Sequence, residues 1–152
     1  MISFGTREFF EHLRDELNRD GKFRKLGKGV YTAKELIYIR DLRIGVWQET
    51  QDGFIQEFRL VPSVELKKKE EEAEIIYYVD SYETLIKMLR GEDSFVSMVI
   101  DGTLEFRGSM RKAMQIQGAS DRMEILVRKI VNQTVIPSKI SFEKWARKEG
   151  YI

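Results

Sequence analysis

Side chains that commonly carry enzyme chemistry are scarce in this chain of 152 residues. There is no cysteine and only one histidine, which excludes a disulfide framework, a thiolate metal site, a cysteine nucleophile and a multi-histidine metal site. His12 lies beside acidic residues at a polar edge of the first amphipathic segment, where we expect a surface side chain. The sequence contains no phosphate-binding loop, no Gly-x-Gly-x-x-Gly fingerprint and no Gly-x-Ser-x-Gly elbow.

Carboxylates, in contrast, are numerous, with 25 Asp and Glu residues. A carboxyl group suited to acid catalysis needs an apolar environment that raises its pKa. We expect none of the 25 to stand isolated among apolar neighbours in this way. An acid–base enzyme therefore has no support in the sequence.

A stronger signal is a group of pliable and bulky apolar residues in the second half of the chain. The group comprises Phe95, Met98, Leu104, Phe106, Met110, Met114, Met123 and Leu126. Unbranched thioether side chains fill irregular space in a core, and they also adapt to varied apolar ligands. The pattern thus predicts either an ordinary core or a cavity for an apolar ligand, and periodicity alone does not separate the two.

Hydrophobic periodicity predicts the elements that would position these residues. Residues 3–18 are expected to form an amphipathic helix, and a second helix is expected to begin with Asp80 as its N-cap and to end at Gly91. The charge run at 67–72 is expected to be a solvated connection or a hairpin end. The first three predicted strands are close enough to form antiparallel hairpins. Strands are predicted at residues 35–40, 44–50, 54–61, 74–79 and 103–107.

Composition predicts one soluble globular unit. The hydrophobic fraction is 42% and the charged fraction 34%, with 26 basic and 25 acidic residues, which fits neither a disordered chain nor a uniformly basic nucleic-acid binder. No stretch approaches the ~18 consecutive apolar residues of a membrane span, and the N-terminus lacks the pattern of a signal peptide. We therefore expect a cytoplasmic protein with no nucleic-acid partner.

Charge is distributed unevenly along the chain. Residues 1–106 hold 16 basic and 21 acidic residues, whereas residues 107–152 hold 10 basic and 4 acidic ones. The basic part ends in a predicted short helix that carries Phe142 and Trp145. This part could make transient contact with an anionic membrane surface, or it could be a solvated face whose tail packs on the body.

A series of short motifs follows in a fixed order through the middle of the chain. They are Ala-Glu at 73–74, Tyr-Glu-Thr at 82–84, Leu-Arg-Gly-Glu at 89–92, Phe95, Gly-Thr-Leu-Glu-Phe-Arg-Gly-Ser-Met at 102–110 and Ala-Met at 113–114. Upstream, Trp47 precedes a Gln-Asp-Gly turn. In order and spacing these motifs resemble the sterol carrier protein type 2 family over roughly residues 4–130, with Glu74 in place of the usual Asp.

The resemblance implies an α/β fold of the α+β type, with a mainly antiparallel five-stranded sheet, helices covering one face and an apolar tunnel between them. It also implies non-catalytic binding, and transfer, of a fatty acid, a sterol-like molecule or another lipid, with no cofactor and no metal. By correspondence with the family, the tunnel would be lined by Trp47, Tyr77, Phe95, Met98, Leu104, Phe106, Met110 and Met114, and the apolar pattern adds Met123 and Leu126.

The same resemblance sets the predicted domain organisation. Residues 1–131 would form the sterol-carrier-like domain. Residues 132–152 would form a C-terminal extension with a short amphipathic helix, packed on the same domain. The extension has no counterpart in a minimal domain of the family.

Two other functions stay open at this point. The apolar residues Ile76 and Tyr78 on the second face of the strand at 74–79, together with the C-terminal extension, would suit a homodimer or protein-interaction module whose tunnel is filled by side chains. The chain could also serve as an accessory subunit, or as an enzyme, in lipid or quinone metabolism, although it lacks a recognisable catalytic set.

Overall fold

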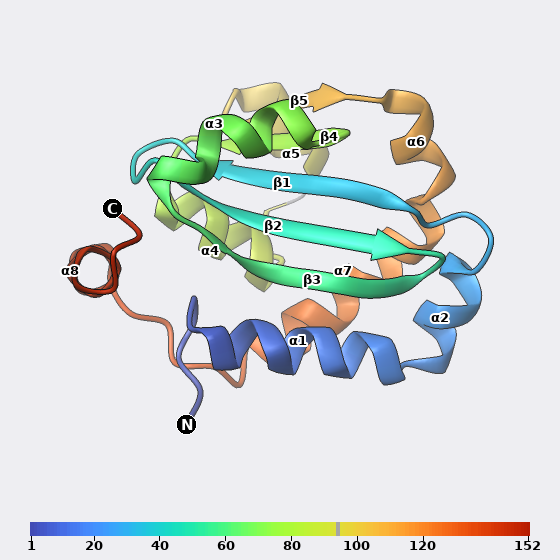
Figure 1. Ribbon diagram of the computed structural model, residues 1–152, viewed down its shortest axis with the longest axis horizontal. Coiled ribbons are helices and arrows are strands. Elements are labelled where there is room, and N and C mark those ends of the chain that lie inside the picture. Colours follow the sequence, from blue (N-terminus) through green and yellow to red (C-terminus); the bar gives the residue numbers. More distant parts are fainter. Residues whose placement is uncertain (94) are drawn as a thin grey trace.

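A five-stranded sheet organises the chain, and helices pack on both of its faces (Figure 1). The computed structural model describes residues 1–93 and 95–152, without the side chains of residues 95 and 96. The elements are α1 (Arg7–Arg19), α2 (Gly21–Gly27), β1 (Ala33–Ile39), β2 (Ile44–Gln51), β3 (Phe54–Val61), α3 (Ser63–Glu72), β4 (Ile75–Val79), α4 (Tyr82–Arg90), α5 (Phe95–Asp101), β5 (Leu104–Gly108), α6 (Met110–Gln115), α7 (Gln117–Val131) and α8 (Lys139–Lys148).

The sheet has the strand order β3-β2-β1-β4-β5 and is mixed. The predicted hairpins are confirmed, because β1 pairs with β2 and β2 with β3 in antiparallel register. Strand β5 pairs antiparallel with β4, whereas β4 runs parallel to β1. The expectation of a mainly antiparallel sheet therefore needs one correction. Helix α3 separates β3 from β4 and gives the chain enough length to cross the sheet and return beside β1 in the parallel direction.

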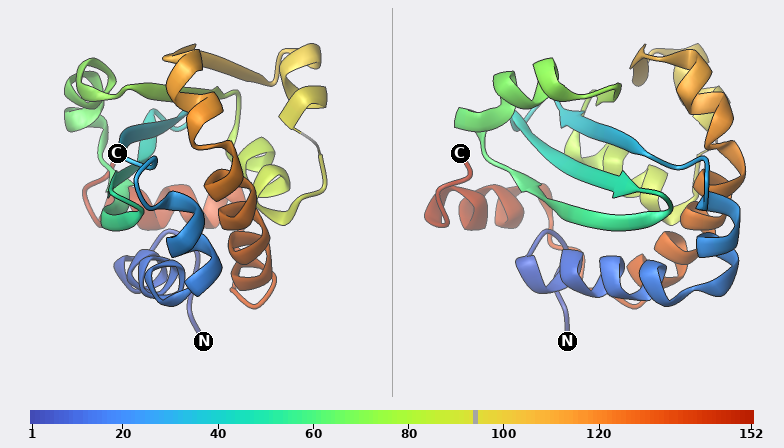
Figure 2. Two further views of the ribbon diagram at one scale, coloured as in Figure 1. Left: turned by 90° about the vertical axis from the view of Figure 1, so that its right-hand side faces the viewer. Right: turned by 45° about the vertical axis from the view of Figure 1, so that its right-hand side comes forward.

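The helices are divided between the two faces of the sheet (Figure 2). On one face α1 packs against β3 and α4 against β4, while α7 contacts α1, α2 and α4. On the other face α3 packs against β1 and β2. The expectation that helices cover only one face is therefore wrong, since α3 covers part of the second.

Helix α3 contains the whole charge run at 67–72, so the expectation of a solvated connection or a hairpin end is wrong for this segment. The helix buries one apolar side chain, Leu66, against Leu36 and Trp47 of the sheet. The Nζ atom of Lys69 lies 4.3 Å from the centroid of the Trp47 ring. A long basic side chain can cover apolar surface with its methylenes while its charged end interacts with an aromatic face. A helix with little amphipathic pattern can therefore still close this side of the sheet.

Helix α4 begins and ends close to the predicted positions. Its N-cap is Ser81 rather than Asp80, and the Ser81 hydroxyl accepts a hydrogen bond from the Thr84 amide. It ends at Gly91, whose φ of 72° is the left-handed conformation that glycine adopts most easily. The helix thus presents Leu85 and Ile86 to the sheet.

The C-terminal segment packs on the rest of the molecule. The Phe142 side chain of α8 is 1% exposed, and its ring stacks on the Tyr82 ring with centroids 4.7 Å apart. The Tyr82 hydroxyl also donates a 2.7 Å hydrogen bond to the carbonyl of Pro137. Within the described ranges, every helix is too short or too polar to span a bilayer.

Candidate functional site

A cavity of about 450 Å³ lies between the sheet and the helices α1, α4 and α7. This volume falls within the ~300–1,000 Å³ of typical small-molecule sites. The floor is formed by side chains of four strands that point to the same face of the sheet. They are Glu35 and Ile37 on β1, Val46 and Gln48 on β2, Phe58 on β3 and Tyr77 on β4.

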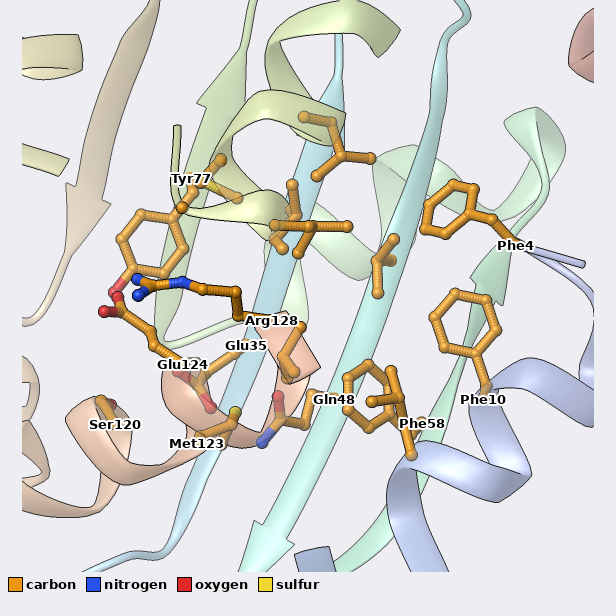
Figure 3. A pocket seen from close by; sticks show the side chains of 18 of the residues that line it. Phe4, Phe10, Glu35, Gln48, Phe58, Tyr77, Ser120, Met123, Glu124 and Arg128 are labelled. Atoms are coloured by element: carbon orange, nitrogen blue, oxygen red, sulfur yellow. The ribbon is translucent and has the colours of Figure 1, made fainter. Parts of the chain in front are cut away.

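Aromatic side chains surround one end of the cavity (Figure 3). The rings of Phe10 and Phe58 have centroids 5.4 Å apart, and Phe4 contacts Phe9 edge-on at 5.1 Å. Gln56 is an extra residue in β3, because Glu49 pairs with Glu57 and Thr50 with Ile55. This bulge explains how Phe58 faces the cavity side together with Ile55.

The middle of the cavity is apolar as well. Leu85, Met88 and Leu89 approach from α4, and Met123 and Val127 approach from α7. No group of three or more His, Cys, Asp or Glu side chains within the described residues is arranged to hold a metal ion. The site therefore offers mainly dispersion contacts and burial of apolar surface.

The other end of the cavity is polar and is built from four buried or half-buried side chains of the sheet and the segment before it. The Tyr31 hydroxyl donates a hydrogen bond to Oε2 of Glu35 and accepts one of 3.1 Å from Nε2 of Gln48. The same Gln48 nitrogen also donates to Oγ1 of Thr50, at 3.2 Å. We call Tyr31, Glu35, Gln48 and Thr50 the polar cluster.

Glu35 has an unusual protonation equilibrium because of its position. Burial raises its pKa from 4.5 to about 7, against the opposing effect of the hydrogen bond from Tyr31, and the negative charge of Glu74 contributes to the rise. The residue retains some exposed area because it borders the cavity, although protein atoms surround its carboxyl group. Burial also raises the pKa of Tyr31 well above the normal range for tyrosine.

The cavity reaches the surface between the end of α4 and the helix α7. The exposed residues Gly91, Asp93, Glu124 and Arg128 belong to its lining, together with the half-buried Ser120. A Cβ atom at Gly91 would lie 2.1 Å from Nε of Arg128, so the guanidinium lies directly against this glycine. Figure 3 shows the side chains of Tyr77, Glu124 and Arg128 grouped near Glu35, with Gln48 between this group and Phe58. The polar end is thus also the end next to the opening.

The residues predicted to line a tunnel fall into several groups. Tyr77 and Met123 line the cavity. Met98 and Leu104 are buried in the core beside it, each 1% exposed. Phe106 and Leu126 are half-buried against a second apolar cluster under the sheet. The side chain of Phe95 lies outside the described residues. Contact of any of these with a ligand stays a prediction.

Three of the predicted residues lie away from the cavity. Trp47 is fully buried but points to the opposite face of the sheet, against α3. Met110 and Met114 are 59% and 69% exposed on α6, because this short helix turns Ala113 and not its methionines toward the apolar cluster. The structure therefore places these two methionines at the surface and not at the cavity.

Sequence reasoning missed the polar cluster altogether. The expectation that no carboxyl group is isolated among apolar neighbours is wrong for Glu35. A signal was available, because Glu35 occupies the same face of its strand as Ala33, Ile37 and Ile39. A charged residue at an inward position of an alternating strand is a candidate functional residue.

Comparisons with known proteins bear on the fold. No family model and no curated protein matches the sequence. Among solved structures, sterol carrier protein 2 superposes with a TM-score of 0.66 at 16% identity, covering 83% of this chain and 98% of that one. A conserved hypothetical protein from Thermus thermophilus, described as a candidate sterol carrier protein, gives the same score and identity over 91% and 94% of the two chains.

A UbiJ-SCP2 ubiquinone synthesis protein is also similar, with a TM-score of 0.52, 14% identity, and coverage of 79% of this chain and 91% of that one. At such identities the likeness concerns the fold. The chain has the fold of sterol carrier protein 2, as the motifs in its sequence predict.

Proposed function

We propose that this protein binds the apolar part of a lipid or lipid-like molecule in the cavity between the sheet and the helices α1, α4 and α7, without catalysing a reaction. The observation that supports this best is the cavity of about 450 Å³ with an aromatic end, an apolar middle and an opening next to its polar end. The shared fold with sterol carrier protein 2 supports the same function.

The energetics suit a ligand with a hydrocarbon chain or ring system. Burying one methylene group contributes about 0.8 kcal/mol, so several buried methylenes give substantial affinity without a specific polar contact. Side chains such as Met88 and Met123 can adapt to ligands of different shapes. We therefore expect hydrocarbon chains of similar length but different shape to bind with similar affinity when their head groups are alike.

Displacement of a neutral environment-sensitive fluorophore, Nile red, by dodecanol tests the proposal. The informative variant is Ile37→Trp, because Ile37 pairs with Val46 and Tyr77 in the centre of the cavity floor. An indole ring there would occupy ligand space, and we expect the affinity for dodecanol to fall at least about tenfold through lost methylene burial.

The matched control is Tyr38→Trp, which also enlarges a half-buried side chain of β1 but on the opposite face, where Tyr38 packs on Tyr78. This control should bind dodecanol like the unmodified protein. Equal affinities of the Ile37→Trp variant and the control, or no displacement of Nile red by any hydrocarbon ligand, would contradict the proposal.

An accessory role in quinone metabolism is a second candidate. Its support is the structural likeness to the UbiJ-SCP2 ubiquinone synthesis protein. A quinone with an isoprenoid tail would use the same apolar cavity, whereas an accessory subunit with a tunnel filled by side chains would bind no such tail. Displacement of Nile red by a short-tailed ubiquinone, compared with dodecanol, distinguishes the two candidates.

Further parts of the functional prediction stay proposals. They are the transfer of ligand between membranes, a transient contact of the basic C-terminal part with an anionic surface, a homodimer and a cytoplasmic location. The tunnel is proposed to be the cavity and its opening beside Arg128.

A further inference from the structure

The polar cluster has a specific pattern of hydrogen-bond donors and acceptors. The Tyr31 hydroxyl proton is directed to Oε2 of Glu35, and the two amide protons of Gln48 are directed to Tyr31 and Thr50. Within the described residues, neither Oε1 of Glu35 nor the amide oxygen of Gln48 accepts a hydrogen bond from a protein group. The donors of Tyr31 and Gln48 are thus used within the cluster, and two acceptors remain.

These two acceptors lie side by side on the cavity floor. Glu35 and Gln48 are directly opposite each other in the antiparallel pair of β1 and β2, and both line the cavity. Protein atoms do not fully enclose either oxygen, which agrees with both oxygens facing the cavity. A buried acceptor without a donor costs about 1–3 kcal/mol, so a ligand that supplies a donor here is favoured.

The head group that fits must suit both protonation states of Glu35. A hydroxyl group donates to the ionised carboxylate and can accept from the protonated acid. A carboxylate can only accept, so it fits only when Glu35 is protonated. An ionised carboxylate beside an ionised Glu35 would place two like charges in a mostly apolar site.

The distribution of the remaining lining agrees with an amphiphile in one orientation. The polar cluster occupies one side of the cavity and Phe4 and Phe10 lie at the other, while Phe58 is directly opposite Gln48 in the β2–β3 pair and lies between them (Figure 3). A hydrocarbon chain would extend along Ile37 and Val46 toward these rings. The head group would then lie beside Glu35 and Gln48.

We propose that the polar cluster selects lipids with a neutral hydroxyl head group over fatty acid anions, with Glu35 and Gln48 as the acceptors of the ligand's hydroxyl proton. This inference rests on the proposed lipid-binding function and names the head-group class of its ligand. Glu35 acts as a specificity-determining residue. The aromatic end contributes affinity that is common to all chains.

The test compares dodecanol with lauric acid, which has the same chain length, by displacement of Nile red. At about pH 8, protonation of a carboxyl group with a pKa of about 7 costs a factor of about ten. We therefore expect dodecanol to bind at least about tenfold more tightly than lauric acid at this pH. In the Glu35→Gln variant the affinity for lauric acid should rise about tenfold, while that for dodecanol should change less than about threefold, because Gln retains an acceptor.

The gain of lauric acid binding cannot arise from partial unfolding, which makes it a safe readout. The control is Glu49→Gln, the same substitution on β2 at a residue beside Gln48 whose side chain belongs to the other face of the sheet. This control should keep the preference for dodecanol. A second readout needs no variant: in the unmodified protein the preference should shrink between about pH 8 and about pH 6, as Glu35 becomes protonated.

Other ionisable groups near the site must be considered in the pH series. Tyr31, Tyr77 and Glu74 surround Glu35, and Asp93, Glu124 and Arg128 lie at the opening. Burial and the charge of Asp121 raise the pKa of Glu124 above its usual value. The Glu124→Gln variant, measured in the same series, assigns any part of the pH effect that this carboxyl group causes.

The outcomes separate the two proposals. If dodecanol and lauric acid both displace Nile red but with a ratio that Glu35→Gln leaves unchanged, the head-group inference is overturned and lipid binding stands. If lauric acid binds as tightly as dodecanol at about pH 8, the inference is also overturned. If neither displaces the probe from the unmodified protein, the lipid-binding function itself is overturned.

Discussion

The two faces of the central sheet differ in how their inward side chains are used. On the face covered by α3, Leu36, Trp47 and Val61 pack against Leu66 and leave Trp47 and Val61 fully buried. On the face covered by α1, α4 and α7, the side chains of the same strands border a cavity, and Glu35 and Gln48 interrupt the apolar surface. One sheet thus has a structural face and a face that can hold a ligand.

This difference follows from what covers each face. A single short helix lies close to the sheet on the α3 face, so the bulky indole of Trp47 fills the space between them. On the other face α1 packs on β3 and α4 packs on β4, at opposite sides of the sheet, and α7 contacts both helices. Three helices arranged around the central strands leave space above them. Empty space and an incompletely bonded carboxyl group both lower stability, and their presence on one face suggests a functional reason.

The largest expected effect comes from the α3 face. Truncation of Trp47 to alanine should lower the free energy of unfolding by about 3–5 kcal/mol, because it removes a fully buried indole from a packed core. Dodecanol should bind the folded fraction with unchanged affinity, since Trp47 points away from the cavity. Urea unfolding followed by circular dichroism gives the stability, and the milder Trp47→Phe variant serves for binding. Weaker dodecanol binding by Trp47→Phe would contradict the claim that the α3 face takes no part in ligand binding.

The next largest expected effect is a pH dependence of the free energy of unfolding that Glu35, on the cavity face, causes. A carboxyl group whose pKa rises from 4.5 in the unfolded chain to about 7 in the folded one binds more protons when folded. The free energy of unfolding should therefore fall as pH rises through this interval, by up to about 3 kcal/mol in total. The Glu35→Gln variant should lack this fall, so it should gain stability relative to the unmodified protein between about pH 5 and about pH 8.

Urea titrations across this pH range measure the difference between the two proteins. Glu49→Gln is the control and should follow the pH dependence of the unmodified protein. A constant difference between Glu35→Gln and the unmodified protein across the range would mean that Glu35 titrates normally. The pKa of Glu35 would then not be raised by its position on the cavity face.

The smallest expected effect is the difference in stability loss when two buried valines, one on each face, are truncated to alanine. Val46 borders the cavity and Val61 lies in the α3 core, and both are buried. Truncation of Val61 to alanine creates a new void, whereas truncation of Val46 extends an existing one. We expect Val61→Ala to lower the free energy of unfolding by about 1 kcal/mol more than Val46→Ala does. Equal losses would indicate that the two faces are packed alike.

Much of the fold could be predicted from the sequence, because local patterns determine it. The hairpins of β1, β2 and β3 follow from closely spaced β-branched and aromatic runs, and the end of α4 follows from Gly91. The parallel pairing of β1 with β4 and the position of α3 depend on contacts between distant segments. Alternation gives no information on these contacts.

The site was harder to predict, for a physical reason that Trp47 illustrates. Alternation assigns residues to one face or the other of a strand, but here both faces are apolar, so it does not say which face borders a cavity. Met110 and Met114 show a second limit, because a short helix at the sheet edge can turn its large apolar side chains to solvent. Glu35 shows the converse, since this polar residue at an inward position of β1 borders the cavity, as Met123 does and as Met110 and Met114 do not.

The most direct test of the difference between the faces is a set of nuclear Overhauser effects between dodecanol and methyl-labelled protein. We expect intermolecular effects from the chain to methyl groups of Ile37, Val46 and Leu85, with the end bearing the hydroxyl nearest Ile37 and Val46. We expect none to Leu36, Val61 or Leu66 of the α3 face. Effects to the second set, or saturating ligand with none to the first, would contradict the assignment of the ligand to the cavity face.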